Sequence, residues 1–183
     1  MHRDLVERAM AGDREAFTEL TRLSIGRLYA VARLILRDDA RAEDATQEAL
    51  VAAWRQLSAL RDPDRFDVWV RRMLVRACYR EAGRDMRHRW AQVGLLQVVG
   101  HVPDPGEALA DQDELARGFA KLSPDQRALV VLHFYLGLPM QETAEILGIP
   151  VGTVKSRLHR TLQQMRATLD ADARLPTTRE RFV

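Results

Sequence analysis

The stretch from 139 to 166 reads PMQETAEILGIPVGTVKSRLHRTLQQMR and contains two helical patterns that meet at Gly148. Gly148 can adopt the left-handed conformation that ends a helix, and Pro150 prevents that helix from continuing. The first pattern covers 140–147 and directs three apolar side chains toward a core, those of Ala144, Ile146 and Leu147.

The second pattern begins near Val151 and has apolar residues three or four positions apart, as on one face of an α-helix. These residues are Val151, Val154, Leu158, Leu162 and Met165. The other face is polar or basic and carries Thr153, Lys155, Ser156, Arg157, His159, Arg160 and Gln163. Two short helices joined by a turn with Gly, the second with a basic outer face, are typical of a helix-turn-helix whose second helix enters the major groove.

The alternative interpretation of this stretch is a helical hairpin with a solvated basic face. A solvated helix normally mixes charges of both signs, with Glu placed four residues before Lys or Arg. Between Val151 and Arg166 there are four basic residues and no carboxylate. Because clustered positive charge indicates a phosphate partner, the pattern favours a DNA-binding helix.

Composition limits the classes of protein that fit. The 183 residues suffice for one or two small domains, and 46% of them are hydrophobic. The net charge is only +2, but 26 of the 28 basic residues are Arg. Arg binds phosphate and carboxylate through a bidentate fork, although an Arg bias can equally reflect genome composition.

The sequence predicts neither a cofactor nor a membrane anchor. Its one cysteine, Cys78, cannot form an internal disulfide, and no Cys/His cluster has the spacing of a zinc site. We expect Cys78 to be a buried, inert thiol and expect no bound metal. No apolar run approaches the length of a membrane span and the N-terminus does not read as a signal peptide, so we expect a cytoplasmic protein.

The hydrophobic patterns predict an all-α fold. Helices are expected over 4–10, 13–36, 40–57, from 64 or 67 to 84, and over 124–136, followed by the two helices already described. Asp13 and Asp39 are expected as N-caps, and Ser123-Pro124 as a helix start. In the second of these helices the core face is expected to contain Phe17, Leu20, Leu23 or Ser24, Leu28, Val31 and Ile35.

The chain is expected to form two small helical domains. The first covers 1–90, and a flexible linker over 91–110 follows, since this stretch has little helical pattern and contains Gly94, Gly100, Pro103, Pro105 and Gly106. The second domain covers 111–171, and 172–183 forms a short tail.

Two helices of the first domain have opposite charge. The helix over 40–57 has a small inner face, made of Ala42, Ala45, Ala49, Ala52, Ala53 and Leu57, and an outer face with Asp44, Gln47 and Glu48. That outer face is either simply solvated or binds a basic partner helix.

The next helix carries a row of Arg at intervals of four, formed by Arg72, Arg76, Arg80 and Arg84. Neighbouring like charges repel, and an anionic partner would relieve the repulsion. Trp69 and Tyr79 lie in the same helix and could stack on bases, but Trp69 is expected mainly in the core.

Several motifs together resemble a known family. Ala16-Phe17, Leu28-Tyr29, 42–49 (AEDATQEA), 53–55 (AWR), Phe66 and Trp69 resemble region 2 of bacterial extracytoplasmic-function sigma factors. The stretches 122–127 (LSPDQR) and 152–160 (GTVKSRLHR) resemble region 4 of the same family. Both sets occur in the family's order and separation over nearly the whole chain, so the joint match is more specific than either half.

The resemblance implies a transcription initiation factor that binds core RNA polymerase and directs it to particular promoters. Asp44, Gln47 and Glu48 would bind the clamp helices of the β′ subunit, and region 4 would meet the β flap. The loop 60–67 and the Arg-rich helix would engage the −10 element. Thr153, Lys155, Ser156, Arg157, His159 and Arg160 would face the −35 element. A separate anti-sigma protein is the usual regulator in the family.

One departure from the family concerns the −10 helix. Many members carry an Asn and an Asp where this chain has Arg76 and Arg80. The resemblance therefore implies only a general phosphate-binding role for Arg72, Arg76, Arg80 and Arg84.

Two other classes of function were considered. A stand-alone helix-turn-helix regulator would bind duplex promoter DNA without polymerase, commonly as a dimer. An enzyme is disfavoured, because the five His residues are scattered and the sequence has no paired nucleophile or Gly-rich phosphate loop.

Overall fold

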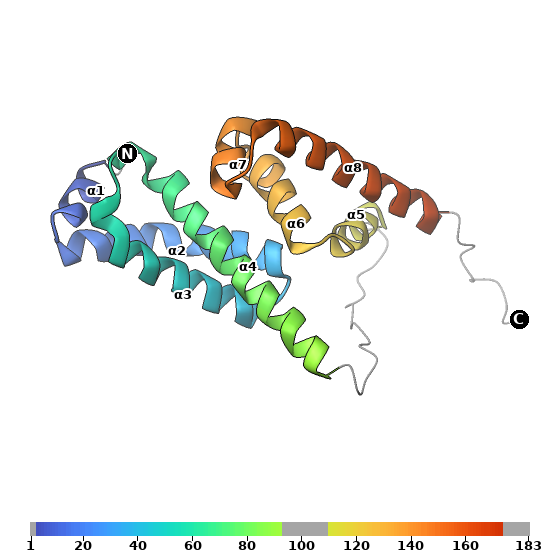
Figure 1. The fold of residues 1–183 in the computed structure, drawn as a ribbon, viewed down its shortest axis with the longest axis horizontal. Coiled ribbons are helices and arrows are strands. Elements are labelled where there is room, and N and C mark those ends of the chain that lie inside the picture. Colours follow the sequence, from blue (N-terminus) through green and yellow to red (C-terminus); the bar gives the residue numbers. More distant parts are fainter. Residues whose placement is uncertain (1–2, 93–109, 174–183) are drawn as a thin grey trace, which may run out of the picture.

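The computed structural model describes residues 3–92 and 110–173, and their regular secondary structure is entirely helical (Figure 1). Side chains are described for residues 3–83 and 115–170. The helices are α1 (Arg3–Met10), α2 (Arg14–Leu36), α3 (Asp39–Gln56), α4 (Phe66–Gln92), α5 (Ala110–Ala120), α6 (Pro124–Val130), α7 (Met140–Leu147) and α8 (Val151–Ala173). The predicted all-α fold with two helical units is confirmed, the first unit being α1–α4 and the second α5–α8.

The start of α2 follows the prediction and the start of α3 does not. The Asp13 carboxylate accepts hydrogen bonds from the backbone N–H groups of Glu15 and Ala16, at 2.9 and 3.0 Å, and so caps α2. The cap of α3 is Asp38 rather than Asp39. Arg37 ends α2 in the left-handed conformation, which leaves Asp38 extended and able to accept from the Arg41 N–H at 3.0 Å. Asp39 is already the first residue of the helix.

The small residues of α3 let it pack closely against α2 and α4. Ala42, Ala45, Ala49 and Ala53 have no exposed surface, and Leu57 beyond them is also buried, as the sequence predicted. On α2 the sequence left Leu23 and Ser24 as alternatives, and the structure favours Ser24, which is half buried, whereas Leu23 is 39% exposed. Ser24 lies four residues after Leu20 and four before Leu28, both of which are buried, and so follows the line that they form.

Helix α4 is longer than predicted. It begins at Phe66, after a 3-10 turn over Pro63–Arg65, and continues to Gln92 instead of ending near Arg84. Most of the predicted linker (91–110) and of the predicted tail (172–183) lies outside the described residues. The bounds of the four predicted segments therefore stay predictions.

The second unit contains the predicted helix-turn-helix. Ser123 caps α6 through a capping box with Gln126. Helix α6 ends at Val130 rather than Leu136, because the chain widens into a π-helical turn over Val131–Tyr135. Gly148 ends α7 with a φ of 68°, the left-handed conformation that the sequence predicted there.

The two units share one apolar core. Five residues of the second unit pack into the core of the first, namely Ala128, Val131, Leu132, Leu138 and Ile146. Helix α6 lies against α2, and α7 lies against α4 (Figure 1). The side chain of Arg127 is 8% exposed at this junction. Its Nε donates to the Ile35 carbonyl at 2.5 Å and its Nη1 to the Leu122 carbonyl at 2.7 Å.

The environment of Arg127 is unusual for an arginine. Burial lowers the pKa of its guanidinium, and the nearby positive charge of Arg37 lowers it further. Two carbonyl acceptors partly compensate for the lost hydration of the guanidinium. Arg127 thus connects the end of α2 to the start of α6 through buried hydrogen bonds.

Candidate nucleic-acid interface and partner-binding surfaces

The helix-turn-helix presents its basic face to solvent. Val154 and Leu158 are buried in the core of the second unit, and the opposite side of α8 is open. Thr153 is half buried, and the five other predicted DNA-contacting residues are exposed, namely Lys155, Ser156, Arg157, His159 and Arg160. Within the described part of the chain, Lys155, Arg157 and Arg160 have no ion-pair partner. The structure brings all six residues onto one helix, and their contact with DNA stays a prediction.

The apolar face of α8 differs from the prediction at one position. Leu162 is 39% exposed, whereas Thr161 is 1% exposed and takes its place in the core. The buried positions are then Val154, Leu158, Thr161 and Met165, with spacings of four, three and four. Thr161 is polar and so is not part of the apolar pattern in the sequence. The helical spacing alone would have included it.

The arginines of the predicted row on α4 are evenly spaced in the sequence but differ in their exposure to solvent. Arg76 and Arg80 are exposed, whereas Arg72 is half buried. The Arg72 Nε is buried and has no hydrogen-bond partner among the described residues. The side chain of Arg84 lies outside the described residues. Trp69 is half buried and packs against the core, and the centroid of its ring lies 6.2 Å from that of Phe66. This position agrees with its predicted role in the core.

The structure joins the acidic and basic helices through Arg80 and Glu48. The Glu48 carboxylate, on α3, accepts from the Arg80 Nε at 3.1 Å and lies 3.0 Å from its Nη2. Both side chains are partly exposed, so the pair contributes at most about 1 kcal/mol to stability. The sequence analysis assigned these two residues to different partners, yet each is the nearest charged partner of the other.

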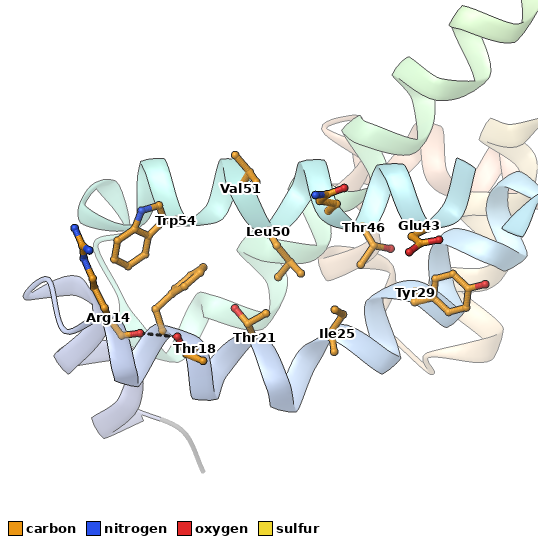
Figure 2. Close-up of a pocket in the computed structure, with 12 residues that line it drawn as sticks. Arg14, Thr18, Thr21, Ile25, Tyr29, Glu43, Thr46, Leu50, Val51 and Trp54 are labelled. Atoms are coloured by element: carbon orange, nitrogen blue, oxygen red, sulfur yellow. Dashed lines mark hydrogen bonds between the residues drawn. The ribbon is translucent and has the colours of Figure 1, made fainter. Parts of the chain in front are cut away.

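The other predicted residues of the acidic face are open to solvent. Asp44 and Gln47 are both exposed, and among the described residues no ion pair engages Asp44. Gln47 also lines a groove of about 1060 Å³ that runs between α2 and α3. Figure 2 shows Leu50, Val51 and Trp54 lining this groove together with Ile25. Phe17 lines it as well. Gln47 therefore connects the predicted acidic face to a partly apolar groove.

The groove has a charge at each end and apolar groups between them. Arg14 lies near Trp54 at one end, and Glu43 lies near Tyr29 at the other (Figure 2). Ile25, Val51 and Trp54 are 45%, 42% and 40% exposed, which is high for large apolar side chains gathered on one surface. Such a surface is typical of a site that binds the apolar face of a partner helix.

Comparison with known proteins identifies the family. Residues 20–88 match the family model described as Sigma-70 region 2, and residues 112–165 match the model described as Sigma-70, region 4. The chain is 34% identical over 157 residues to the ECF RNA polymerase sigma factor SigM of Mycobacterium tuberculosis, a match that covers 86% of this chain and 79% of that protein. The chain belongs to the extracytoplasmic-function family of RNA polymerase sigma factors.

Solved structures of other sigma factors have the same fold. CnrH, in complex with the cytosolic domain of CnrY, is 27% identical with a TM-score of 0.65, over 93% of this chain and 97% of that one. RpoE from Bartonella quintana, in complex with the anti-sigma factor NepR, is 25% identical with a TM-score of 0.66, over 85% of this chain and 98% of that one. This sigma factor is accordingly a promoter-directing transcription initiation factor.

The one cysteine of this sigma factor, Cys78, is buried. Burial raises the pKa of the Cys78 thiol to about 12, so this residue is unreactive as predicted. Among the described residues, no group of His, Cys, Asp and Glu could hold a metal ion, and no helix is both long and apolar enough to cross a membrane. Sigma factors are initiation factors rather than catalysts.

Two features of this sigma factor escaped the sequence analysis. The groove was missed because it depends on how α2 and α3 pack, although Trp54 within a motif of the family was a signal. The second feature is the contact of α7 with the loop 60–67, where Glu145 pairs with Arg65. These residues are 80 positions apart, and no pattern in the sequence connects them.

Proposed function

We propose that this sigma factor binds core RNA polymerase through the outer face of α3 and the adjoining groove, and that it reads promoter DNA with α8 and α4. The observation that carries this proposal is that Asp44 is exposed on α3, three residues before Gln47, and that Gln47 lines a groove with exposed apolar side chains. A partner helix with an apolar face would bury that face in the groove. Basic residues beside the apolar face would then pair with carboxylates of α3 such as Asp44. The clamp helices of the β′ subunit are the expected occupant, with region 4 meeting the β flap.

Promoter reading is divided between the two units in this proposal. The exposed residues of α8, which are Thr153, Lys155, Ser156, Arg157, His159 and Arg160, meet the −35 element. The loop 60–67 and the arginines of α4 meet the −10 element through phosphate contacts. The support is electrostatic, since both surfaces are rich in Arg and α8 has no carboxylate before Asp170.

The proposal extends to regulation and location. The solved structures of CnrH and RpoE contain a second protein, the cytosolic domain of CnrY or the anti-sigma factor NepR. By analogy, an anti-sigma protein is expected to regulate this chain as well. The proposed function of this sigma factor requires no enzymatic activity and no cofactor. This sigma factor would act in the cytoplasm, where polymerase and DNA are.

The test is co-purification of core polymerase with variants of the α3 surface. Asp44→Arg places a cation opposite the basic residues of the partner and should cost several kcal/mol of binding, roughly a hundredfold or more. Trp54→Ala removes an exposed aromatic anchor and should cost about 2 kcal/mol, if it is central to the interface. Glu48 is left unchanged, because its substitution would also break the pair with Arg80.

Asp170→Arg is the matched control, since it reverses the charge of an exposed carboxylate at the far end of α8. The control should recover as much polymerase as the wild type. Equal recovery from Asp44→Arg, Trp54→Ala and the wild type would remove the support for this docking surface.

The stand-alone helix-turn-helix regulator makes the opposite prediction. It would bind duplex promoter DNA tightly in the absence of polymerase, and Asp44→Arg would leave its function intact. Membership in the sigma factor family favours the polymerase-dependent function.

A further inference from the structure

Helix α1 packs against the loop 60–67, which connects α3 to α4. Val6, on α1, and Phe66, at the end of the loop, are both buried and belong to the same apolar core. A cavity of about 80 Å³ has both residues in its wall, together with Arg3 and Asp64. The helix and the loop therefore meet through a buried apolar contact with a charged border.

Arg3 joins the two elements at this border. Its Nη1 donates a hydrogen bond to the Asp64 carboxylate at 2.5 Å, and its Nε donates one to the Glu7 carboxylate at 2.8 Å. One guanidinium thus bridges a carboxylate of its own helix and a carboxylate of the loop. An Arg can do this because its donors form a fixed planar fork, whereas the ammonium group of Lys is a compact point charge.

The backbone of the loop fixes the direction in which Asp64 points. Asp62 accepts a hydrogen bond from the Asp64 backbone N–H at 3.0 Å, and Pro63 begins a 3-10 turn that ends at Arg65. A 3-10 helix has three residues per turn, so neighbouring side chains point about 120° apart. While Asp64 is held against α1, Arg65 must therefore point to a different side of the loop.

The two sides of the loop carry different charges. On the side of α1, Asp64 and Asp67 line the small cavity. On the other side, Arg61 and Arg65 line a second cavity, of about 220 Å³, whose wall also includes the start of α4. Asp62 lies on this second side as well, but its carboxylate is engaged by the Asp64 N–H. The free carboxylates of the loop are thus kept apart from its arginines.

We infer that Arg3 is a positioning residue for reading the −10 element, which holds Asp64 against α1 so that the arginine side of the loop meets DNA without a competing carboxylate. This inference rests on the proposed contact of the loop with the −10 element. Phosphates attract a guanidinium and repel a carboxylate. Without Arg3, Asp64 can turn toward the DNA and offset the charge of Arg61 or Arg65.

The pair of Arg3 and Asp64 is too exposed to contribute much to the stability of the fold. The two side chains are 58% and 60% exposed, so solvent screens their attraction. Replacing Arg3 should therefore leave the melting temperature unchanged. An effect on promoter binding then reports on the loop and not on unfolding.

The test measures the affinity of the polymerase complex for promoter DNA by quantitative footprinting. The probe is a duplex promoter fragment, found by sequencing the transcripts that increase when the full chain is overexpressed. Arg3→Ala should weaken binding about two- to fivefold, the effect of one exposed ion pair. Arg3→Lys should weaken it less, because the ammonium group can still reach Asp64 but cannot bridge to Glu7 at the same time.

The decisive variant removes the charge of Asp64. Asp64→Asn keeps the shape of the side chain but leaves no carboxylate to repel DNA, so its affinity should not fall below that of the wild type. In the Asp64→Asn background, Arg3→Ala should have no further effect. A merely structural role of Arg3, or a direct contact between Arg3 and a phosphate, would not depend on the charge of Asp64 in this way.

Arg8→Ala is the matched control. Arg8 lies on the same helix, is exposed, and pairs with Asp13 at 2.6 Å rather than with the loop. Its replacement removes the same charge from α1 and should leave the promoter affinity at the wild-type value. Core polymerase should be recovered equally with all of these variants, because none of them lies on the α3 surface.

The outcomes separate the inference from the function on which it rests. Equal affinities of the wild type and Arg3→Ala would overturn the inference. So would a loss that Arg8→Ala reproduces, or one that persists in the Asp64→Asn background. A loss that only Arg3→Ala causes, and that Asp64→Asn abolishes, supports it.

A double variant, Arg61→Ala with Arg65→Ala, tests the proposed role of the loop by itself. If this variant binds the promoter as tightly as the wild type, the loop does not contact DNA and both the inference and the proposed contact fail. If it binds more weakly while Arg3→Ala does not, the proposed contact stands and only the inference fails.

Discussion

Helices α4 and α8 both carry rows of positive charge, but their neighbours leave different parts of those rows available. On α8 the cations at 155, 157 and 160 are exposed and have no ion-pair partner in the part of the chain that the structure describes. On α4, Arg80 is held by Glu48, and Arg72 is half buried beside Glu145. The difference shows that a row of charges in the sequence does not reveal which charges are free to bind a partner.

The cause of the difference lies in the packing of the two helices. Helix α4 is central, with α3 on one side and α7 on another, and both neighbours bring carboxylates to it. Helix α8 is at the outside of its unit (Figure 1), and its cations at 155, 157 and 160 are exposed. We therefore expect α8 to bind DNA through charges that are always available, and α4 partly through charges that must first be released, such as that of Arg80.

The largest effect is expected on α8. Lys155→Ala and Arg160→Ala should each weaken promoter binding by the polymerase complex by about 1–3 kcal/mol, roughly five- to hundredfold. Neither side chain contributes to the core, so the melting temperature should not change. Quantitative footprinting on a cognate promoter measures the affinity, and Arg166→Ala, further along the same helix, is the control. Normal transcription by both variants would show that α8 is not the reading helix.

A smaller and unequal effect is expected on α4. Arg76 is exposed, so Arg76→Ala should lower the slope of log K against log salt concentration by about 1, as for the loss of one phosphate contact. Arg80→Ala should change the slope less, because Arg80 has to leave Glu48 before it can bind phosphate. Titrations of the polymerase complex on promoter DNA at several salt concentrations give both slopes. Identical changes would mean that the Arg80–Glu48 pair is already broken in the complex.

The smallest effect is expected from Glu48→Gln. This substitution releases Arg80 but removes only a partly exposed ion pair, so the free energy of unfolding should fall by less than about 1 kcal/mol. Urea denaturation of the free protein measures the change. A loss well above 1 kcal/mol would mean that the pair is a structural element of the α3–α4 contact, and α4 would then offer one basic group fewer to DNA.

The sequence was a good guide wherever the signal is local. The Ala face of α3, the cap at Asp13 and the turn at Gly148 all follow from propensities and spacings within a few residues, and the structure confirms them. The exposed face of α8 follows in the same way from the position of its apolar residues. The resemblance of two motif sets then identified the family, which the comparisons confirm.

The sequence was a poor guide wherever a feature needs two elements to meet. The Arg80–Glu48 pair, the groove between α2 and α3, and the Arg65–Glu145 pair each join residues far apart in the chain. The Arg80–Glu48 pair had a signal in the sequence, namely the opposite charges of two consecutive helices. The shift from Asp39 to Asp38 as a cap and the π-helical turn after Val130 are local, but each depends on a single backbone residue that propensities do not distinguish.

Arg127 has a consequence for how the protein melts. Its buried hydrogen bond to the Ile35 carbonyl and the apolar residues around it make the first unit depend on the second for part of its stability. Heating the free chain should therefore give one cooperative transition in calorimetry, with equal calorimetric and van't Hoff enthalpies. Anything that separates the units, whether polymerase, DNA or a substitution, should divide that transition into two. The shape of the heat-capacity curve is thus a direct measure of whether the two units are packed together.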